Sequence, residues 1–158
     1  NFSQLSVKLG QKEKAEGIIK ECDERISKVK LKLQNEKKIK VFVEIGIKPL
    51  MTVGGNTFIN ELIELAGGIS ISKDMESAYP KYSLEDIILK NPEVILISEM
   101  GDLTGGEVDN WKKFNQLDAV KNNKIVVIDP HLICSPVPTS FATGVEEIAE
   151  LLHPEKFK

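Results

Sequence analysis

Three residues in one short stretch carry side chains that commonly bind metals. Asp129, His131 and Cys134 lie close together in the sequence, and carboxylate, imidazole and thiolate groups are usual ligands of a transition metal. Pro136 and Pro138 follow closely, and no second pair of residues with metal-site spacing accompanies them. The pattern therefore favours an ordinary histidine in a surface loop over a metal site.

The hydroxyl and carboxylate groups do not form a catalytic pattern. The hydroxyl groups nearest His131 in sequence belong to Ser135, Thr139 and Ser140, but no GxSxG motif places a nucleophile on a strained turn beside a base. The glutamates expected near strand ends or at a helix start are Glu44, Glu85 and Glu99. Their spacing does not pair them as general acid and base, so we predict no catalytic residues and no enzyme activity.

A glycine-rich turn leaves one alternative open. The turn Gly54-Gly55-Asn56-Thr57 precedes a helical segment, and backbone N–H groups at a helix start can bind a phosphate. The turn lacks the lysine of a P-loop and the spacing of GxGxxG, and ordinary turn chemistry accounts for its two glycines. A small α/β enzyme, or a phosphate- or nucleotide-binding domain that uses this turn, remains the alternative function.

The composition is that of one globular domain with a substantial core. The chain has 158 residues, of which 41% are hydrophobic and 28% charged, and its net charge is −3. Because both signs are interspersed, the sequence has no basic stripe for nucleic acid or a membrane surface. Cys22 and Cys134 are too few and too far apart for a disulfide scaffold. No apolar run approaches the roughly 18 residues of a membrane-spanning helix.

The elements that must position these residues alternate between strand and helix. The expected strands are residues 39–45, 69–72, 93–98 and 125–128. The expected helices are residues 57–66, 84–90 and 140–152, with short helical turns from Trp111 to Val120. Residues 129–138 are expected to form an irregular loop. This order predicts the α/β class, with right-handed crossovers and a mainly parallel sheet of about four strands.

A long amphipathic pattern precedes these elements. Apolar residues recur at helical spacing from Ala15 to Leu33 and predict one helix over residues 11–36. At ~1.5 Å per residue such a helix is about 39 Å long, which exceeds what this domain needs to cover its own sheet. We therefore divide the chain into an N-terminal segment with the long helix, residues 1–38, and an α/β lobe, residues 39–158.

The fold class also indicates where a ligand binds. In an open α/β sheet, ligands lie outside the carboxyl ends of the strands. That rule selects four loops in this chain, residues 46–56, 73–82, 99–107 and 129–138.

Several segments follow one another in an order that resembles a known family. They are LGxxxKAEGII, KVFVEIG, GNTFINELIELAGG, YPKYSLEDIILKNPEVILIS, IDPHL with SPVP, and VEEIAELLHPEKF. Together they resemble the C-terminal lobe of class III substrate-binding proteins, the receptors of ABC importers for cobalamin, ferric siderophores and haem. The resemblance covers essentially the whole chain. It implies a three-layer αβα lobe, preceded by the one long helix that forms a rigid backbone between two lobes.

The resemblance implies capture and delivery of a ligand without catalysis. In that family a shallow cleft between two lobes holds the ligand, and the receptor passes it to an ABC permease and its ATPase. We therefore expect a metal chelate as ligand, either cobalamin or iron in a siderophore or haem, with no cofactor or metal site belonging to the chain. The intact receptor is expected outside the cytoplasm, in the periplasm or as a membrane-anchored lipoprotein.

The missing half of such a receptor has its own consequences. The N-terminal lobe is expected to be absent from this chain, which leaves apolar residues of the start and of the long helix uncovered. The apolar residues of the start are Phe2, Leu5, Val7 and Leu9. A pure interaction domain that dimerises through the apolar stripe of the long helix is a further alternative, and the exposed start and helix favour a homodimer of this chain. On the helix, Ile26, Val29 and Leu33 should pack on this lobe, whereas Ala15 and Ile18 should be less buried.

The resemblance also assigns roles to particular residues. The loop before Glu85 supplies aromatic residues to the cleft in the family, which implies that Tyr79 and Tyr82 contact ligand here. A flat aromatic surface suits a large rigid ligand. Weaker candidates on the other strand-end loops are Met51, Met100 and His131. Many relatives have an arginine at the position of Thr139, so an anionic siderophore is less expected.

Glu85 has two interpretations. In the first turn of a helix, a carboxylate interacts favourably with the helix dipole, which needs no partner. The resemblance implies instead that Glu85 docks on an arginine pocket of the permease, and we take docking as the prediction.

Overall fold

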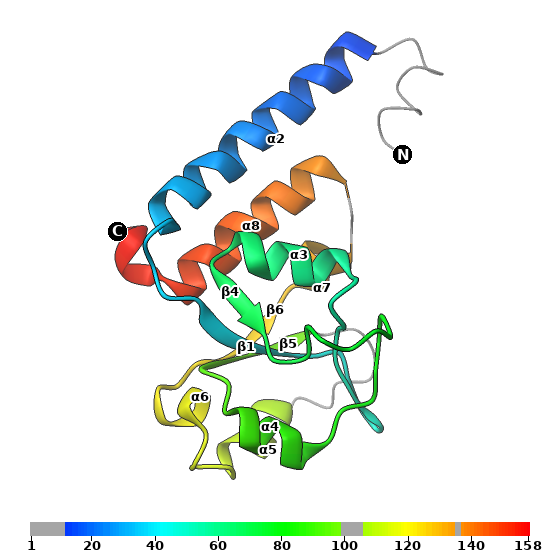
Figure 1. Ribbon diagram of the computed structural model, residues 1–158, viewed down its shortest axis with the longest axis vertical. Coiled ribbons are helices and arrows are strands. Elements are labelled where there is room, and N and C mark those ends of the chain that lie inside the picture. The colour runs from blue at the N-terminus through cyan, green and yellow to red at the C-terminus, as the bar shows by residue number, and fades with distance from the viewer. Residues whose placement is uncertain (1–11, 99–105, 135–136) are drawn as a thin grey trace.

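A four-stranded parallel sheet forms the centre of the protein (Figure 1). The computed structural model describes residues 12–98, 106–134 and 137–158. The strands lie in the order β4, β1, β5, β6, and every neighbouring pair is parallel. Their bounds are Ile39–Glu44 for β1, Gly68–Ser70 for β4, Val94–Ser98 for β5 and Ile125–Ile128 for β6. The α/β class and the parallel sheet predicted from the sequence are confirmed.

Helices cover both faces of this sheet (Figure 1). On one face lie α2 (Lys12–Leu33), α3 (Phe58–Leu65), α7 (Pro130–Cys134) and α8 (Pro138–Leu152). On the other lie α4 (Leu84–Lys90), α5 (Glu107–Lys112) and α6 (Asp118–Lys121). A short 3₁₀ helix, Pro154–Lys156, follows α8. None of the helices in the described part of the chain combines the length and the apolar character needed to cross a membrane.

Strand β1 shows how the sheet divides the hydrophobic core in two. Val41 and Val43 belong to the core beneath α2, α3 and α8, whereas Phe42 belongs to the core with α4, α5 and α6. All three side chains are completely buried. Because side chains alternate between faces that are both covered, residues 41–43 of the strand are all apolar.

One arginine joins α2 to α8, which lie side by side (Figure 1). Arg25 Nε donates a hydrogen bond to Glu146 Oε1 over 3.0 Å, and its Nη2 donates to Thr143 Oγ1 over 3.0 Å. The hydrogen bond from Arg25 holds the pKa of Glu146 below its ordinary value. Val29 and Leu33, toward the end of α2, are buried in the core, as expected from the sequence.

The structure corrects the expectation for the start of the long helix. Ile18 is half-buried, but Ala15 is only 4% exposed. Long helical side chains lean back over the turn that precedes them, and Ile18 and Ile19 stand three and four residues after Ala15. The helix itself ends at Leu33 rather than near residue 36, because the chain turns there and Glu36 N donates to Leu33 O.

The loop expected at residues 129–138 is largely helical. Helix α7 begins at Pro130 and α8 begins at Pro138. Proline is favoured at the first helical position, where its missing N–H costs nothing and its fixed φ suits the helix. Prolines that suggested an irregular loop in the sequence therefore mark two helix starts.

Two loops at the carboxyl end of β1 are joined into one structure, which we call the strand-end platform, residues 46–55 and 73–82. Its first part contains a hairpin of β2 (Gly46–Ile47) and β3 (Leu50–Met51). Residues 50–55 then bond to the second part, with Thr52 N donating to Pro80 O, Gly54 N to Ala78 O and Tyr82 N to Leu50 O over 2.9 to 3.1 Å. These bonds fix the loop that carries Tyr79 relative to the sheet.

Gly54 is required by this joint, and its replacement tests the platform. An added Cβ at Gly54 lies 2.0 Å from Ser77 O, so the backbone of the second loop must move. We expect Gly54→Ala to destabilise the protein by more than ~2 kcal/mol in urea unfolding. Gly17→Ala is the matched control, because nothing lies within 4 Å of that position on α2, and it should stabilise by about 0.5–1 kcal/mol. Equal stability of Gly54→Ala and the unmodified protein contradicts the platform.

The Arg25–Glu146 pair predicts a pH-dependent contribution to stability. At neutral pH, Arg25→Ala should lower the free energy of unfolding by about 1–2 kcal/mol, since the pair is charge-assisted and partly buried. The pKa of Glu146 is lowered by folding, so this contribution is present above the ordinary carboxyl value of 4.5 and is lost as pH falls through the lowered pKa.

Urea unfolding at several pH values measures this difference. Lys20→Ala is the control, because Lys20 and Glu24 are 4.0 Å apart with exposed side chains, and it should change stability by well under ~0.5 kcal/mol. A cost for Arg25→Ala that stays constant from neutral pH to below the carboxyl range contradicts this assignment.

Candidate functional site

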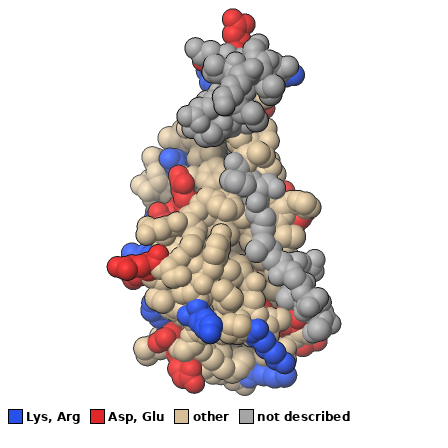
Figure 2. Space-filling view, turned by 90° about the vertical axis from the view of Figure 1, so that its right-hand side faces the viewer, with Lys and Arg blue, Asp and Glu red and all other residues tan. Residues whose placement is uncertain are grey.

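The side of the molecule at which β1 ends is the candidate site. Figure 2 shows this side, which also carries the strand-end platform. Among the residues that Figure 2 colours, the middle of this side is mostly uncharged, while Lys, Arg, Asp and Glu side chains gather along its margins and its lower part. Uncharged surface of this kind at the carboxyl ends of parallel strands is where an α/β protein binds a ligand.

Tyr79 and Met51 both lie on the platform. Tyr79 is 46% exposed on the second loop, and Met75 on the same loop is 37% exposed. Met51 is half-buried on β3 and forms an isolated bridge with Lys81. The structure therefore brings together two of the residues named from the sequence and presents Tyr79 to solvent. Whether either contacts ligand remains a prediction.

Tyr82 takes a different position from Tyr79. Its ring centre lies 6.0 Å from that of Phe42 in the core of the α4 side, and its hydroxyl group donates to Ile71 O over 3.2 Å. The Lys90 ammonium lies 5.7 Å from the same ring. Tyr82, the last residue of the platform, is thus held against the core by these contacts. We do not include it among the proposed ligand contacts.

The remaining candidates from the sequence are dispersed. His131 is exposed in the first turn of α7, where its backbone N–H donates to Asp129 Oδ1 over 2.8 Å. Asp129 thus caps a helix, which is the ordinary use of an aspartate before a helix. Thr139 is exposed in the first turn of α8. Met100 and the side chain of Cys134 lie outside the described residues.

The Gly54-Gly55-Asn56-Thr57 turn uses several of its polar groups within the protein. Gly54 N donates to Ala78 O, and Gly55 N donates to Met75 O over 3.3 Å. Thr57 Oγ1 donates to Gly54 O over 2.8 Å and accepts from Asn60 N. The N–H groups of Gly54 and Gly55 and the Thr57 hydroxyl group thus serve the platform and the start of α3, which weakens the case for a phosphate site at this turn.

Glu85 projects from the first turn of α4. Ser83 caps this helix by accepting from Asp86 N over 3.0 Å, so Glu85 is not needed for the cap. Within residues 12–98, 106–134 and 137–158, Glu85 is exposed and has no hydrogen bond or ion pair. The position suits docking on a positively charged partner, which remains a prediction.

One group of side chains among the described residues has a geometry that could hold a metal. Glu36, His153 and Glu155 offer ligand atoms within 4.8 Å of one another. However, the Lys156 ammonium lies 2.7 Å from Glu36 Oε1, and His153 Nε2 lies 3.2 Å from Gly67 O. The group is therefore engaged in joining the end of the chain to the end of α2 and the start of β4.

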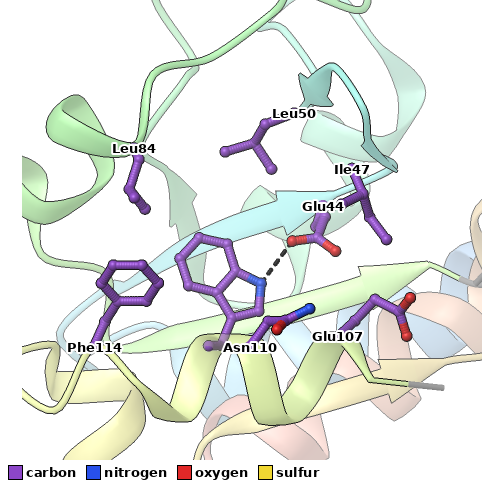
Figure 3. A pocket seen from close by; sticks show the side chains of 8 residues that line it. Glu44, Ile47, Leu50, Leu84, Glu107, Asn110 and Phe114 are labelled. Atoms are coloured by element: carbon purple, nitrogen blue, oxygen red, sulfur yellow. Dashed lines mark hydrogen bonds between the residues drawn. The ribbon is translucent and has the colours of Figure 1, made fainter. Parts of the chain in front are cut away.

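A small cavity beside the platform contains a buried acid that sequence reasoning did not identify as part of a site. The cavity has a volume of about 170 Å³ and lies between the β2–β3 hairpin, the start of α4 and α5 (Figure 3). Glu44, the last residue of β1, is 4% exposed and lines it. Trp111 Nε1 donates to Glu44 Oε2 over 2.6 Å.

The electrostatics of Glu44 are unusual for a glutamate. Burial raises its pKa, the hydrogen bond from Trp111 opposes that rise, and the nearby Glu107 adds to it. Glu44 Oε1 is buried without a hydrogen-bond partner in the described structure. The sequence contained one signal, since an acid ends an otherwise apolar strand, but nothing in the spacing linked it to a tryptophan 67 residues away.

Comparison with known proteins identifies the family. The sequence model described as periplasmic binding protein matches residues 1–132. A vitamin B12-binding protein of Vibrio parahaemolyticus is 27% identical over 146 residues, which cover 92% of this chain and 52% of the relative. An uncharacterised ABC transporter substrate-binding lipoprotein of Bacillus subtilis is 25% identical over 153 residues, which cover 94% of this chain and 48% of the relative.

The fold agrees with this match. The crystal structure of a periplasmic binding protein from Veillonella parvula superposes with a TM-score of 0.84 at 20% identity, over 96% of this chain and 54% of that one. The chain thus spans about half the length of the curated relatives that it matches. With a family match over most of its residues and the same α/β architecture, the chain belongs to the periplasmic binding protein family.

Proposed function

We propose that this chain is the ligand-binding lobe of an extracytoplasmic ABC-transporter receptor for a metal chelate. Family membership supports a transport role, because the family is one of substrate-binding proteins rather than enzymes. The observation that carries the proposal is Tyr79, exposed on a loop that backbone hydrogen bonds fix, beside the uncharged surface that the described residues form at the strand ends.

The chemistry of this face suits a large, rigid ligand. An aromatic ring stacks on a flat conjugated surface without requiring one specific partner atom. A vitamin B12-binding protein is among the relatives, so a corrinoid is the first candidate, and ferric siderophores and haem are the others. Binding then depends on shape and aromatic contact, and the metal stays within the chelate.

The intact receptor contains a second lobe in this proposal. Half of the length of the relatives lies outside this chain, and helix α2 provides the backbone between the lobes. Since the ligand sits between two faces, each face alone offers only part of the contact needed to offset the loss of translational and rotational freedom. The relative that is a lipoprotein supports a location at the outer surface of a membrane.

Calorimetric titration of the intact receptor and of this chain tests the function. We expect the intact receptor to bind one of cyanocobalamin, ferrioxamine B and haemin, and this chain alone to bind more weakly than micromolar. In the intact receptor, Tyr79→Ala should weaken binding about tenfold or more, as for a central aromatic contact. Leu89→Ala is the control, because Leu89 is 82% exposed on α4, and it should leave the affinity unchanged.

Two results count against the proposal. Micromolar or tighter binding by this chain alone contradicts capture between two lobes, and failure of the intact receptor to bind any of the three chelates contradicts the ligand class. Light scattering on both proteins shows whether self-association belongs to the receptor. If this chain alone forms a homodimer and the intact receptor is a monomer, the dimer forms through surface that the second lobe covers.

Delivery to a permease through Glu85 is tested by charge reversal. Glu85→Lys in the intact receptor should reduce transporter-dependent uptake strongly, because like charges then oppose each other at the docking surface, while chelate affinity stays within about twofold. Glu147→Lys is the matched control, since Glu147 is exposed on α8 across the sheet from α4. Normal uptake by the Glu85→Lys receptor, with its ligand affinity intact, excludes a docking role for this residue.

A further inference from the structure

A buried carboxylate lines a small open space beside the platform. Glu44 Oε2 accepts the indole N–H of Trp111, whereas Oε1 has no hydrogen-bond partner among the described residues. Buried polar atoms are nearly always paired, and leaving an acceptor of this kind empty costs stability. Glu44 is 4% exposed and lines the cavity beside the platform, so the unpaired oxygen has room for a partner.

Accepting the hydrogen bond from Trp111 does not by itself require a glutamate at position 44. A glutamine at position 44 accepts the same hydrogen bond from Trp111 and avoids the cost of burying an ionisable group. In the described part of the chain, the second oxygen of this carboxyl group has no hydrogen-bond partner, and a second acid, Glu107, lines the same space. Two acids at one end of the cavity favour a hydrogen-bond donor and oppose a carboxylate.

The dimensions limit what can enter. The volume of about 170 Å³ is below the ~300–1,000 Å³ that sites for whole drug-sized ligands occupy. Ile47 and Leu50 of the hairpin and Leu84 of α4 form apolar walls around the polar end (Figure 3). The cavity therefore fits one short side group of a larger molecule that lies across the platform.

We propose that Glu44 Oε1 accepts a hydrogen bond from a nitrogen donor, a primary ammonium or a carboxamide N–H, that projects from the ligand into this cavity. The assignment rests on the proposed function for the identity of the larger molecule. It makes the receptor selective for chelates whose periphery carries amine or amide groups, against those whose periphery carries carboxylates. Glu44 is then a specificity-determining residue, and Trp111 holds its carboxylate in position.

Small probes test the cavity without the second lobe. Trp111 is the single tryptophan of the chain and shares its hydrogen bond with Glu44, so its fluorescence and the ¹⁵N and ¹H shifts of its indole N–H report on the cavity. We expect a saturable change with methylammonium or with acetamide and none with acetate. The affinities of methylammonium and acetamide, compared with each other, show whether the cavity prefers a charged donor or a neutral one. No change with either donor, or an equal change with acetate, overturns the assignment.

Two variants make the test specific. Glu44→Gln keeps an acceptor for Trp111 and turns an NH₂ group toward the cavity, so it should weaken binding of the donor probe at least tenfold and create a response to acetate. Ile47→Phe narrows the cavity from the hairpin without touching the Glu44–Trp111 hydrogen bond, and it should abolish the response to every probe. Circular dichroism verifies folding of both variants. Unchanged probe binding in either folded variant overturns the assignment.

A chelate pair links the cavity to the intact receptor. Ferrioxamine B carries a terminal ammonium group that its N-acetylated form lacks, and Glu44→Gln should reduce the difference in affinity between the two. If the probes bind but no chelate does, the proposed function is wrong and the cavity assignment stands. If chelates bind and Glu44→Gln alters neither probe nor chelate binding, the cavity assignment is wrong and the function stands.

Discussion

Strand β1 is buried on both faces, and the arrangement of the remaining elements follows from that constraint. Its side chains alternate between two cores, so helices must cover each face of the sheet. The strand also pairs with β4 on one side and β5 on the other, which makes it central. Where it leaves the sheet, its last residue, Glu44, is still buried, and the cavity and the platform are built around that point.

The platform extends the fixed backbone structure of β1 beyond the edge of the sheet. The ten-residue loop 73–82 is held in place because it bonds along the backbone to residues 50–55. The close approach needs glycine at positions 54 and 55, where carbonyl groups of the second loop occupy the space of a side chain. A preorganised surface loses less entropy when a ligand binds, so under the proposed function this joint serves recognition as well as stability.

Local patterns in the sequence were enough to predict the four strands of the sheet and its longer helices, but not the β2–β3 hairpin or α7. The apolar runs located all four strands of the sheet, and helical spacing located α2, α3, α4 and α8. Errors arose where one residue type has two uses. Pro130 and Pro138 were taken as signs of an irregular loop and instead begin helices, because proline disfavours helix interiors but suits a first turn.

The candidate site was less accessible to sequence reasoning because its groups meet only through the fold. Tyr79 and Tyr82 are three residues apart and similar in sequence context, yet one is exposed and the other packs on Phe42. Glu44 ends β1 and Trp111 lies on α5, and β5 separates these two elements in the chain. No periodicity in the sequence relates the two residues. Gly54 and Gly55, which suggested a phosphate site, are needed because a second loop packs against them. That loop starts 18 residues after Gly55 in the sequence.

The two parts of the site can divide the work of recognition between them. An exposed aromatic face gives contact area and tolerates many flat ligands, so by itself it discriminates poorly. A recessed acid surrounded by apolar walls adds little area, but a wrong group placed against it is costly, because the low dielectric strengthens both attraction and repulsion. Glu44 ends the central strand, and Trp111 holds one of its oxygens. In this proposal the selective group therefore sits on a strand that is paired on both sides, while the tolerant aromatic group, Tyr79, lies on a loop of the platform.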